Sequence, residues 1–234
     1  MCRPASMIAT LGHKMTWSPT KDSHSDIRAE FGMPENGIGR INSVQIEITP
    51  PNGDYSLPPT QWTFCVDQDT LPDWWDAEEA EKQCRIALEA WAKVRLVRSG
   101  EVRTLNDGEH VTALCGGTLS KMCGGTLSKM SGGTLSEMCG GTLSKMSGGT
   151  LSYMSGGTLS KMFGGTLSYM SGGTLSKMFG GALSEMSGGT ASFNRHFECK
   201  LIGQMSVIID RSGTKARCIV GTEKMRTVRA TKRK

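Results

Sequence analysis

The sequence predicts a mainly β protein built around a β-solenoid, and three observations lead to that prediction. Residues 116–189 repeat one eight-residue phrase, x-Gly-Gly-Thr-Leu-Ser-x-Met, without an insertion. A unit this short cannot bury its own apolar side chains, so it must stack on copies of itself. Two glycines in every unit would interrupt a helix repeatedly, whereas they suit a turn that precedes a short strand.

The variable positions predict about two octapeptide units, or 16 residues, in each coil. The residue before each Met, read at every second unit, separates into a lysine row and a mixed row. The lysine row is Lys129, Lys145, Lys161 and Lys177, and the mixed row is Lys121, Glu137, Tyr153, Tyr169 and Glu185. The residues after Met sort in the same way, with Phe above Phe and Cys above Cys. Recent duplication of a two-unit block would leave the same pattern without a structural cause, and that alternative stays open.

The Leu and Met of the repeat are three residues apart, so a regular strand would point them to opposite faces. Either a corner at Ser-x turns both side chains inward, or Thr, Ser and Met share the inner face. We favour the corner, because Leu and Met are the only large apolar residues in most units. The residue between them varies among Lys, Glu and Tyr, as a solvent-facing position should.

The segments around the repeat predict two caps. Residues 44–48 and 62–66 alternate apolar and polar side chains around a Pro-Pro-Asn-Gly-Asp turn, which indicates a β-hairpin. A helix is expected from about residue 71 to residue 94, with Asp73 as its N-cap. Residues 205–209 and 217–220 indicate a second hairpin beyond the repeat.

The predicted organisation therefore has five parts. They are a poorly ordered segment at 1–40, a hairpin and helix capping domain at 41–107, the solenoid at 108–193, a C-terminal hairpin cap at 194–222 and a basic flexible tail at 223–234. From Arg211 onward nine basic residues face one acidic residue, a net +8, while the whole chain carries +5. The positive charge is thus concentrated at the C-terminal end.

Composition excludes several classes of protein. The sequence has neither a run of about 18 apolar residues nor an apolar signal core, so we expect a cytoplasmic protein with no membrane association. Cys123 and Cys139 would stack one coil apart, within reach of a disulfide, but reduced thiols are favoured without an export signal. The histidines are scattered and no Cys-x-x-Cys pair occurs, so neither a metal site nor a cofactor is expected. No catalytic constellation is found, and we expect no enzyme activity.

Binding candidates come from the charged and aromatic rows and from the tail. The lysine row gathers four ammonium groups that an anionic partner would stabilise, and Tyr153 and Tyr169 on the opposing row would add stacking. The tail candidates are Lys224, Arg226, Arg229, Lys232, Arg233 and Lys234, which would neutralise phosphates without base specificity. The competing interpretations are a solvated face that blocks edge aggregation and a solubilising terminus.

The repeat, written Gly-Gly-Thr-Leu-Ser-Lys-Met, resembles uncharacterised tandem-octapeptide proteins of phage and bacterial genomes, whose units run Gly-Gly-Thr-(Val/Ile)-x-x-Val. The resemblance covers roughly residues 41–190, which include the aromatic segments at 61–64 and 71–76. Leu and Met replace the usual β-branched pair. The architecture is also similar to pentapeptide-repeat solenoids, some of which imitate DNA, but that imitation needs an acidic surface and here lysine outnumbers glutamate. The resemblance implies a shape and no activity.

The sequence thus predicts a non-enzymatic macromolecule-binding or structural repeat protein. Its expected partner is another protein, or a second copy of the chain, bound through the caps and especially through Trp74, Trp75 and Trp91. Nonspecific nucleic-acid binding by the lysine row and the tail is the alternative. An ice- or glycan-binding solenoid is a remote third possibility. Ice binding requires a flat array of regularly spaced hydroxyls, whereas the two hydroxyls of each strand here flank a leucine.

Overall fold

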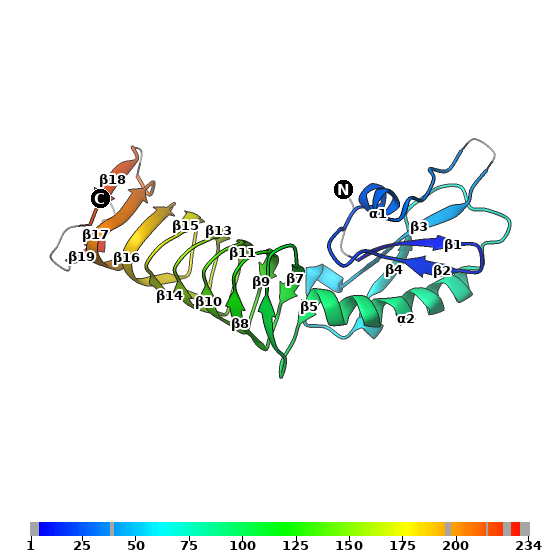
Figure 1. Ribbon diagram of the computed structural model, residues 1–234, viewed down its shortest axis with the longest axis horizontal. Coiled ribbons are helices and arrows are strands. Elements are labelled where there is room, and N and C mark those ends of the chain that lie inside the picture. Colours follow the sequence, from blue (N-terminus) through cyan, green and yellow to red (C-terminus); the bar gives the residue numbers. More distant parts are fainter. Residues whose placement is uncertain (1–4, 38–39, 195–197, 214, 222–225, 230–234) are drawn as a thin grey trace. The chain divides into compact units, whose positions relative to one another are not determined.

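The computed structural model describes residues 5–37, 40–194, 198–213, 215–221 and 226–229. The chain divides into two compact units, Met1–Arg95 and Leu96–Lys234. The first combines a small sheet with two helices and the second is the solenoid (Figure 1).

The first unit is built on a four-stranded antiparallel sheet in the order β2-β1-β3-β4. Its strands are β1 (Ser6–Thr10), β2 (Lys14–Thr16), β3 (Ser43–Thr49) and β4 (Thr63–Val66), and its helices are α1 (His24–Phe31) and α2 (Ala77–Arg95). Two short 3-10 turns, η1 (Pro51–Gly53) and η2 (Pro59–Gln61), lie in the β3–β4 connection. The predicted hairpin is confirmed, because Ile46 pairs with Val66 and Ile48 with Phe64.

The prediction that residues 1–40 are poorly ordered is wrong for the described part of that segment. Strand β1 pairs along its whole length with β3, and Met7 and Ile8, which point to opposite faces, are both fully buried. Cys84 of α2 contacts Met7 through sulfur at 3.6 Å, and α1 lies on the other side of the sheet (Figure 1). With both faces covered, β1 lacks the polar alternation that would have identified it.

A buried ion pair fastens the same segment to α2. Arg95, at the end of α2, is completely buried, and its guanidinium donates to the carboxylate of Asp22 at 2.5 Å. It also donates to the backbone carbonyls of Ser18 and Lys21 at 3.4 Å. Burial lowers the pKa of Arg95, and the neighbouring Asp22 opposes that shift. The segment before α1 is therefore part of the core of this unit.

The helix predicted from residue 71 begins later, at Ala77, and its N-cap is Asp76 and not Asp73. The Asp76 carboxylate accepts hydrogen bonds from the backbone N–H groups of Glu78 and Glu79 at 3.0 and 3.1 Å. These are the donors that an N-cap side chain satisfies. Asp76 is itself positioned by His13, whose Nε2 accepts its backbone N–H at 3.0 Å. The sequence alone did not show which of the two aspartates, Asp73 or Asp76, caps the helix.

Replacing Asp76 by Ala is expected to destabilise the protein by about 1 kcal/mol, because two N–H groups of the first turn lose their acceptor. Replacing the exposed Asp73 by Ala is the matched control and should change little. Urea unfolding followed by tryptophan fluorescence measures both. Equal losses at the two positions would contradict the assignment of the cap.

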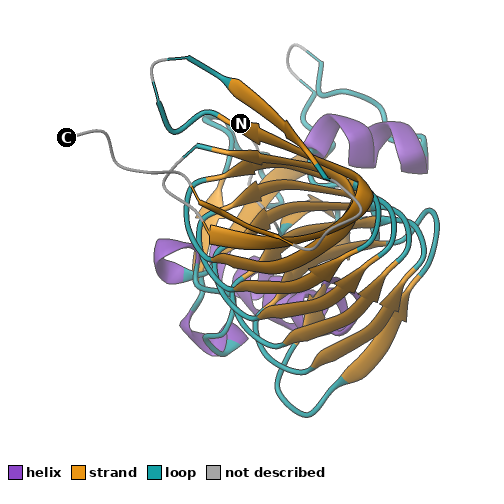
Figure 2. Ribbon diagram, turned by 90° about the vertical axis from the view of Figure 1, so that its left-hand side faces the viewer, coloured by secondary structure: helices purple, strands orange, loops and turns teal. Residues whose placement is uncertain are grey.

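The solenoid is one 15-stranded sheet that winds as two stacked series of strands joined through β16 (Figure 2). The first series is β5 (Leu96–Val97), β7 (His110–Leu114), β9 (Thr126–Met130), β11 (Thr142–Met146), β13 (Thr158–Met162) and β15 (Thr174–Met178). The second is β6 (Val102–Leu105), β8 (Thr118–Met122), β10 (Thr134–Met138), β12 (Thr150–Met154) and β14 (Thr166–Met170), and β16 spans Ala182–Phe193.

The predicted coil of two octapeptide units is confirmed by the register. Tyr153 pairs with Glu137 on one side and Tyr169 on the other, each two units away along the chain. Turns continue the pairing, since the N–H of Thr150 donates to the carbonyl of Gly133 at 3.0 Å. The solenoid also begins earlier than the predicted residue 108, because β5 and β6 already pair in parallel with β7 and β8.

Both apolar residues of the repeat line the core, as the favoured interpretation predicted. On β12, Leu151 and Met154 are completely buried. Thr150 and Ser152, on either side of the leucine, are half-buried, and Tyr153 is exposed. The same pattern recurs from β8 to β15, and the buried leucines and methionines form one continuous cluster. Each coil therefore buries its side chains only against its neighbours, as a solenoid requires.

Beyond the repeat, β17 (Glu198–Asp210) stacks in parallel on β16 and extends the solenoid. It also pairs antiparallel with β18 (Arg217–Val220), through Ile208 and Ile219 among others, which confirms the predicted C-terminal hairpin. The tail predicted to be flexible from residue 223 instead contains a strand, β19 (Arg226–Arg229), that pairs with the first half of β17. The rest of the tail lies outside the described residues.

Candidate functional site

The four lysines predicted as a binding row do lie in one row. Lys145 on β11 pairs with Lys129 on β9 and with Lys161 on β13. Lys177 continues the row on β15, because the residues that flank Lys161 and Lys177 are paired in register. Three of these lysines are exposed and Lys129 is half-buried. Because coils are spaced about 4.8 Å apart, the row places like charges close together and favours an anionic partner.

An aromatic pair borders the lysine row. Phe163 and Phe179, which follow β13 and β15, stack with their ring centroids 5.1 Å apart and their planes 14° apart. Phe163 is 46% exposed, and the ammonium of Lys145 lies 5.0 Å from its ring centroid. A cation at this distance from a ring is attracted by about 0.5–1 kcal/mol. Sequence reasoning grouped these phenylalanines but left them out of the site, although each lies two residues after a lysine of the row.

The mixed row on the second series has a different character. The ammonium of Lys121 lies 3.4 Å from the Glu137 carboxylate, and that hydrogen bond raises the pKa of Lys121. Tyr153 stacks on Tyr169 at 5.5 Å with 7° between the rings. Glu185 is the next residue in register. With one lysine against two glutamates, this row is weakly negative where the lysine row is strongly positive.

Serines hold the tyrosine pair in place. The Tyr169 hydroxyl donates to Ser187 at 2.7 Å, and the Ser171 hydroxyl donates to the Tyr153 oxygen at 2.8 Å. Both tyrosines belong to strands of the second series, so they lie on the row opposite the lysines, as predicted. The phenylalanines, and not the tyrosines, are the aromatic groups next to the lysine row.

The tail candidates are only partly described. Arg226 and Arg229 lie on β19, where their backbones pair with Leu201 and Glu198. The other predicted tail residues, Lys224, Lys232, Arg233 and Lys234, lie outside the described residues.

The cysteines that the structure describes are free thiols. Cys123 and Cys139 directly follow the neighbouring strands β8 and β10 of the second series, and each lies two residues after Lys121 or Glu137. The hydrogen bond between the Cys139 thiol and Cys123 raises the pKa of Cys139, and the Met122 carbonyl lies 3.4 Å from the Cys139 sulfur as an acceptor. In the first unit, burial raises the pKa of Cys84 to about 12.

The tryptophans proposed as partner contacts behave differently from one another. Trp91 is 1% exposed and packs edge-on against Trp62 with 5.8 Å between ring centroids, so it is a core residue and its predicted role is wrong. Trp74 and Trp75 are half-buried, and both rings lie 5.7 Å from the imidazole of His13. Their indoles help to hold the loop before α2.

Comparison with known proteins identified no similar protein. No family model matches the chain, and neither a curated protein nor a solved structure matches it significantly. Among the described residues, no helix combines the length and the apolar character needed to cross a membrane.

Proposed function

We propose that the solenoid is a non-enzymatic binding module whose ligand is an extended single strand of nucleic acid, held along the lysine row. The observation that supports this most directly is the contrast between the two rows. Lys129, Lys145, Lys161 and Lys177 follow one another with no acidic residue between them, whereas the opposite row pairs Lys121 with Glu137. A polyanion therefore has one favourable face.

The aromatic pair favours a ligand with flat rings. Single-strand binding combines a positive surface that follows the phosphates with aromatic side chains on which bases stack, each stack contributing about 1–3 kcal/mol. Phe163 is exposed beside Lys145 and Lys161, so one surface offers both kinds of contact. Neighbouring phosphates lie further apart than neighbouring coils, and the long lysine side chains accommodate this difference. Because lysines contact the phosphates, no base preference is expected.

The distance between the carboxylates of the repeats argues against glycoside-hydrolase activity. Glu137 and Glu185 lie three coils apart on the same row, because the register runs from Glu137 through Tyr153 and Tyr169 to Glu185. Three coils correspond to about 14 Å. The paired carboxylates of glycoside hydrolases are about 5–9.5 Å apart.

A protein partner is the second candidate function, and the C-terminal hairpin favours it. Met205 on β17 is 82% exposed, and Val220 on β18, which pairs with Val207 two residues further along β17, is 51% exposed. Apolar side chains exposed together at the end of a solenoid suit contact with another protein or with a second copy of the chain.

Changing all four lysines of the row to Ser is expected to weaken both the binding of single-stranded DNA and its salt dependence. Four lost phosphate contacts should flatten the slope of log affinity against log salt by about 2.8. The wild type should then lose about fiftyfold more affinity than the variant between roughly 50 and 200 mM salt. Fluorescence anisotropy with a labelled oligothymidylate of about 15 nucleotides measures this.

The matched control changes four residues of the opposite row, Lys121, Glu137, Tyr153 and Tyr169, to Ser. Its slope should equal that of the wild type. A protein shortened by residues 224–234 separates the contribution of the tail. If the wild type does not bind at low salt, or if both quadruple variants lose the same affinity, the lysine row is not a nucleic-acid site and the protein partner becomes the leading candidate.

A further inference from the structure

The first unit brings together one histidine and two carboxylates from distant parts of the sequence. His24 is the first residue of α1, Glu47 lies on β3 and Asp67 directly follows β4. Potential ligand atoms of these three side chains all lie within 4.8 Å of one another. We propose that they form a binding site for a divalent cation of the zinc class.

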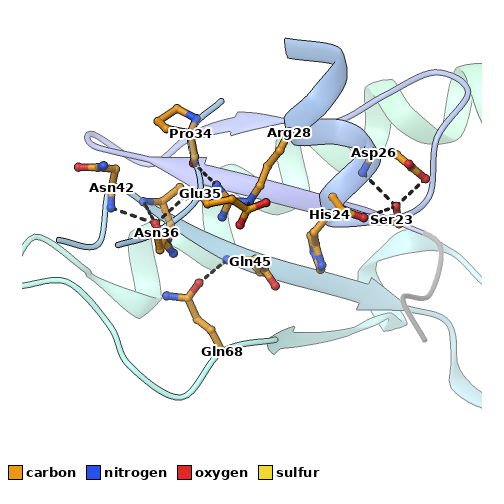
Figure 3. A network of polar contacts seen from close by, with 12 residues as sticks. Ser23, His24, Asp26, Arg28, Pro34, Glu35, Asn36, Asn42, Gln45 and Gln68 are labelled. Carbon is orange, nitrogen blue, oxygen red and sulfur yellow. Dashed lines mark hydrogen bonds and ion pairs between the residues drawn. The ribbon is translucent and has the colours of Figure 1, made fainter. Parts of the chain in front are cut away.

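The strand register explains why the two carboxylates meet. Glu47 pairs with Cys65, and residues two apart on a strand share a face, so Asp67 lies on the same face as Glu47. The N–H of Asp67 donates to the Gln45 carbonyl at 2.8 Å, which extends the pairing by one residue. Gln68 then accepts from the N–H of Gln45 at 3.0 Å (Figure 3). The backbone under the site is thus fixed by β3.

The histidine is oriented as a metal ligand. His24 is 2% exposed, and its Nε2 lies 3.0 Å from the Ile46 carbonyl, an acceptor that requires the proton to be on Nε2. In the neutral ring this leaves the lone pair on Nδ1, which lies 3.5 Å from a carboxylate oxygen of Asp67. A backbone carbonyl on the far nitrogen is the usual partner that fixes the tautomer of a metal-binding histidine.

The distance between His24 and Asp67 suits a small tetrahedral ion. Zinc binds histidine nitrogen and carboxylate oxygen at about 2.0–2.2 Å, so two ligands of a tetrahedral zinc ion lie roughly 3.3–3.5 Å apart. The 3.5 Å between His24 and Asp67 already meets this value. Asp67 is half-exposed, which gives the ion a path from solvent and leaves room for a water as fourth ligand.

The surrounding charges also favour a cation. Glu47 and Asp67 contribute two negative charges, and Ser23 and Asp26 hydrogen-bond to each other at the start of α1 (Figure 3). The nearest buried cation on the helix, Arg28, donates to the Pro34 carbonyl at 2.7 Å, and its Nε lies 4.0 Å from Glu35. Arg28 is thus directed toward a different acidic residue. A bound ion would connect α1 to β3 and to the end of β4.

Histidine NMR tests the site directly on the full-length protein. Titration of ¹⁵N-histidine-labelled protein with Zn²⁺ is expected to shift the Nδ1 resonance of His24 at one equivalent, while the resonances of His13 and His110 stay in place. Isothermal titration should show that Asp67→Asn weakens this Zn²⁺ binding by at least the roughly 10- to 100-fold that loss of an outer-shell partner costs. Zn²⁺ should also raise the thermal midpoint of the wild type and not that of the variant.

Asp69→Asn is the matched control, because Asp69 is an exposed carboxylate two residues further on and outside the cluster. Its Zn²⁺ affinity should equal that of the wild type. Since cysteines also bind zinc, Co²⁺ spectra should show ligand-field bands for the wild type without a thiolate charge-transfer band. Zn²⁺ binding that leaves His24 unshifted, or that Asp67→Asn does not weaken, would overturn the proposal. Asp67 is half-exposed, so this variant is expected to fold even if His24 variants do not.

Discussion

Replacing Gly157 by Ala is expected to reduce the free energy of unfolding of the solenoid by roughly 2–5 kcal/mol, as the sum of backbone strain and overpacking. Gly157 has a φ of +73°, which a side chain disfavours. A Cβ atom there would also lie 2.7 Å from the carbonyl oxygens of Gly140 and Gly141 in the coil below. Relief of that contact would separate two coils and weaken their backbone hydrogen bonds. Chemical denaturation followed by circular dichroism measures the loss.

Gly100→Ala separates the two causes. Gly100 also has a positive φ, +82°, but a Cβ atom there would meet no atom within 4 Å. This control keeps the strain and removes the clash, so it should cost only about 1–2 kcal/mol. Equal destabilisation by the two substitutions would show that close stacking of the coils is not what requires glycine in the repeat.

Replacing Asp22 by Ala is expected to destabilise the first unit by about 3 kcal/mol, because removing the carboxylate partner of Arg95 leaves a buried charge without compensation. Arg95 is completely buried. The value lies at the lower end of the usual range, because Asp22 is itself 29% exposed and water can approach. Thermal unfolding followed by tryptophan fluorescence reports on this unit, since all five tryptophans lie before residue 96.

The double variant Asp22→Ala/Arg95→Met tests the cause. Replacing both ions by apolar groups removes the uncompensated charge, so the double variant should recover part of the stability that Asp22→Ala loses. Asp73→Ala removes an exposed aspartate in the same unit and should have little effect. A double variant less stable than Asp22→Ala would mean that Arg95 contributes mainly through its contacts with backbone carbonyls.

The solenoid was predictable because every coil repeats the same information. The register followed from matching Lys145 with Lys161 and Tyr153 with Tyr169, and the structure has those pairs. Burial of both Leu151 and Met154 also followed, since no other large apolar residue was available to fill the coil.

The first unit was predicted less well because its contacts are not local. Strand β1 pairs with β2 only over its last three residues, and its full length is paired by β3, as in Ile8 with Gln45, which lies far along the chain beyond α1. With residues 1–40 predicted to be poorly ordered, His24 had no reason to be placed beside Asp67. The lysine row was found because it is periodic, whereas the aromatic pair beside it occurs in only two coils and its relation to Lys145 depends on side-chain geometry.

The two unlike rows restrict how this chain can change in length. Successive strands alternate between the two series, so each added or removed octapeptide transfers every later strand to the other series. Loss of one octapeptide in the middle of the repeat would place later lysines above tyrosines and phenylalanines above serines. Only gains or losses of octapeptides in pairs leave both rows intact. Natural length variants of such a protein are therefore expected to differ by whole coils.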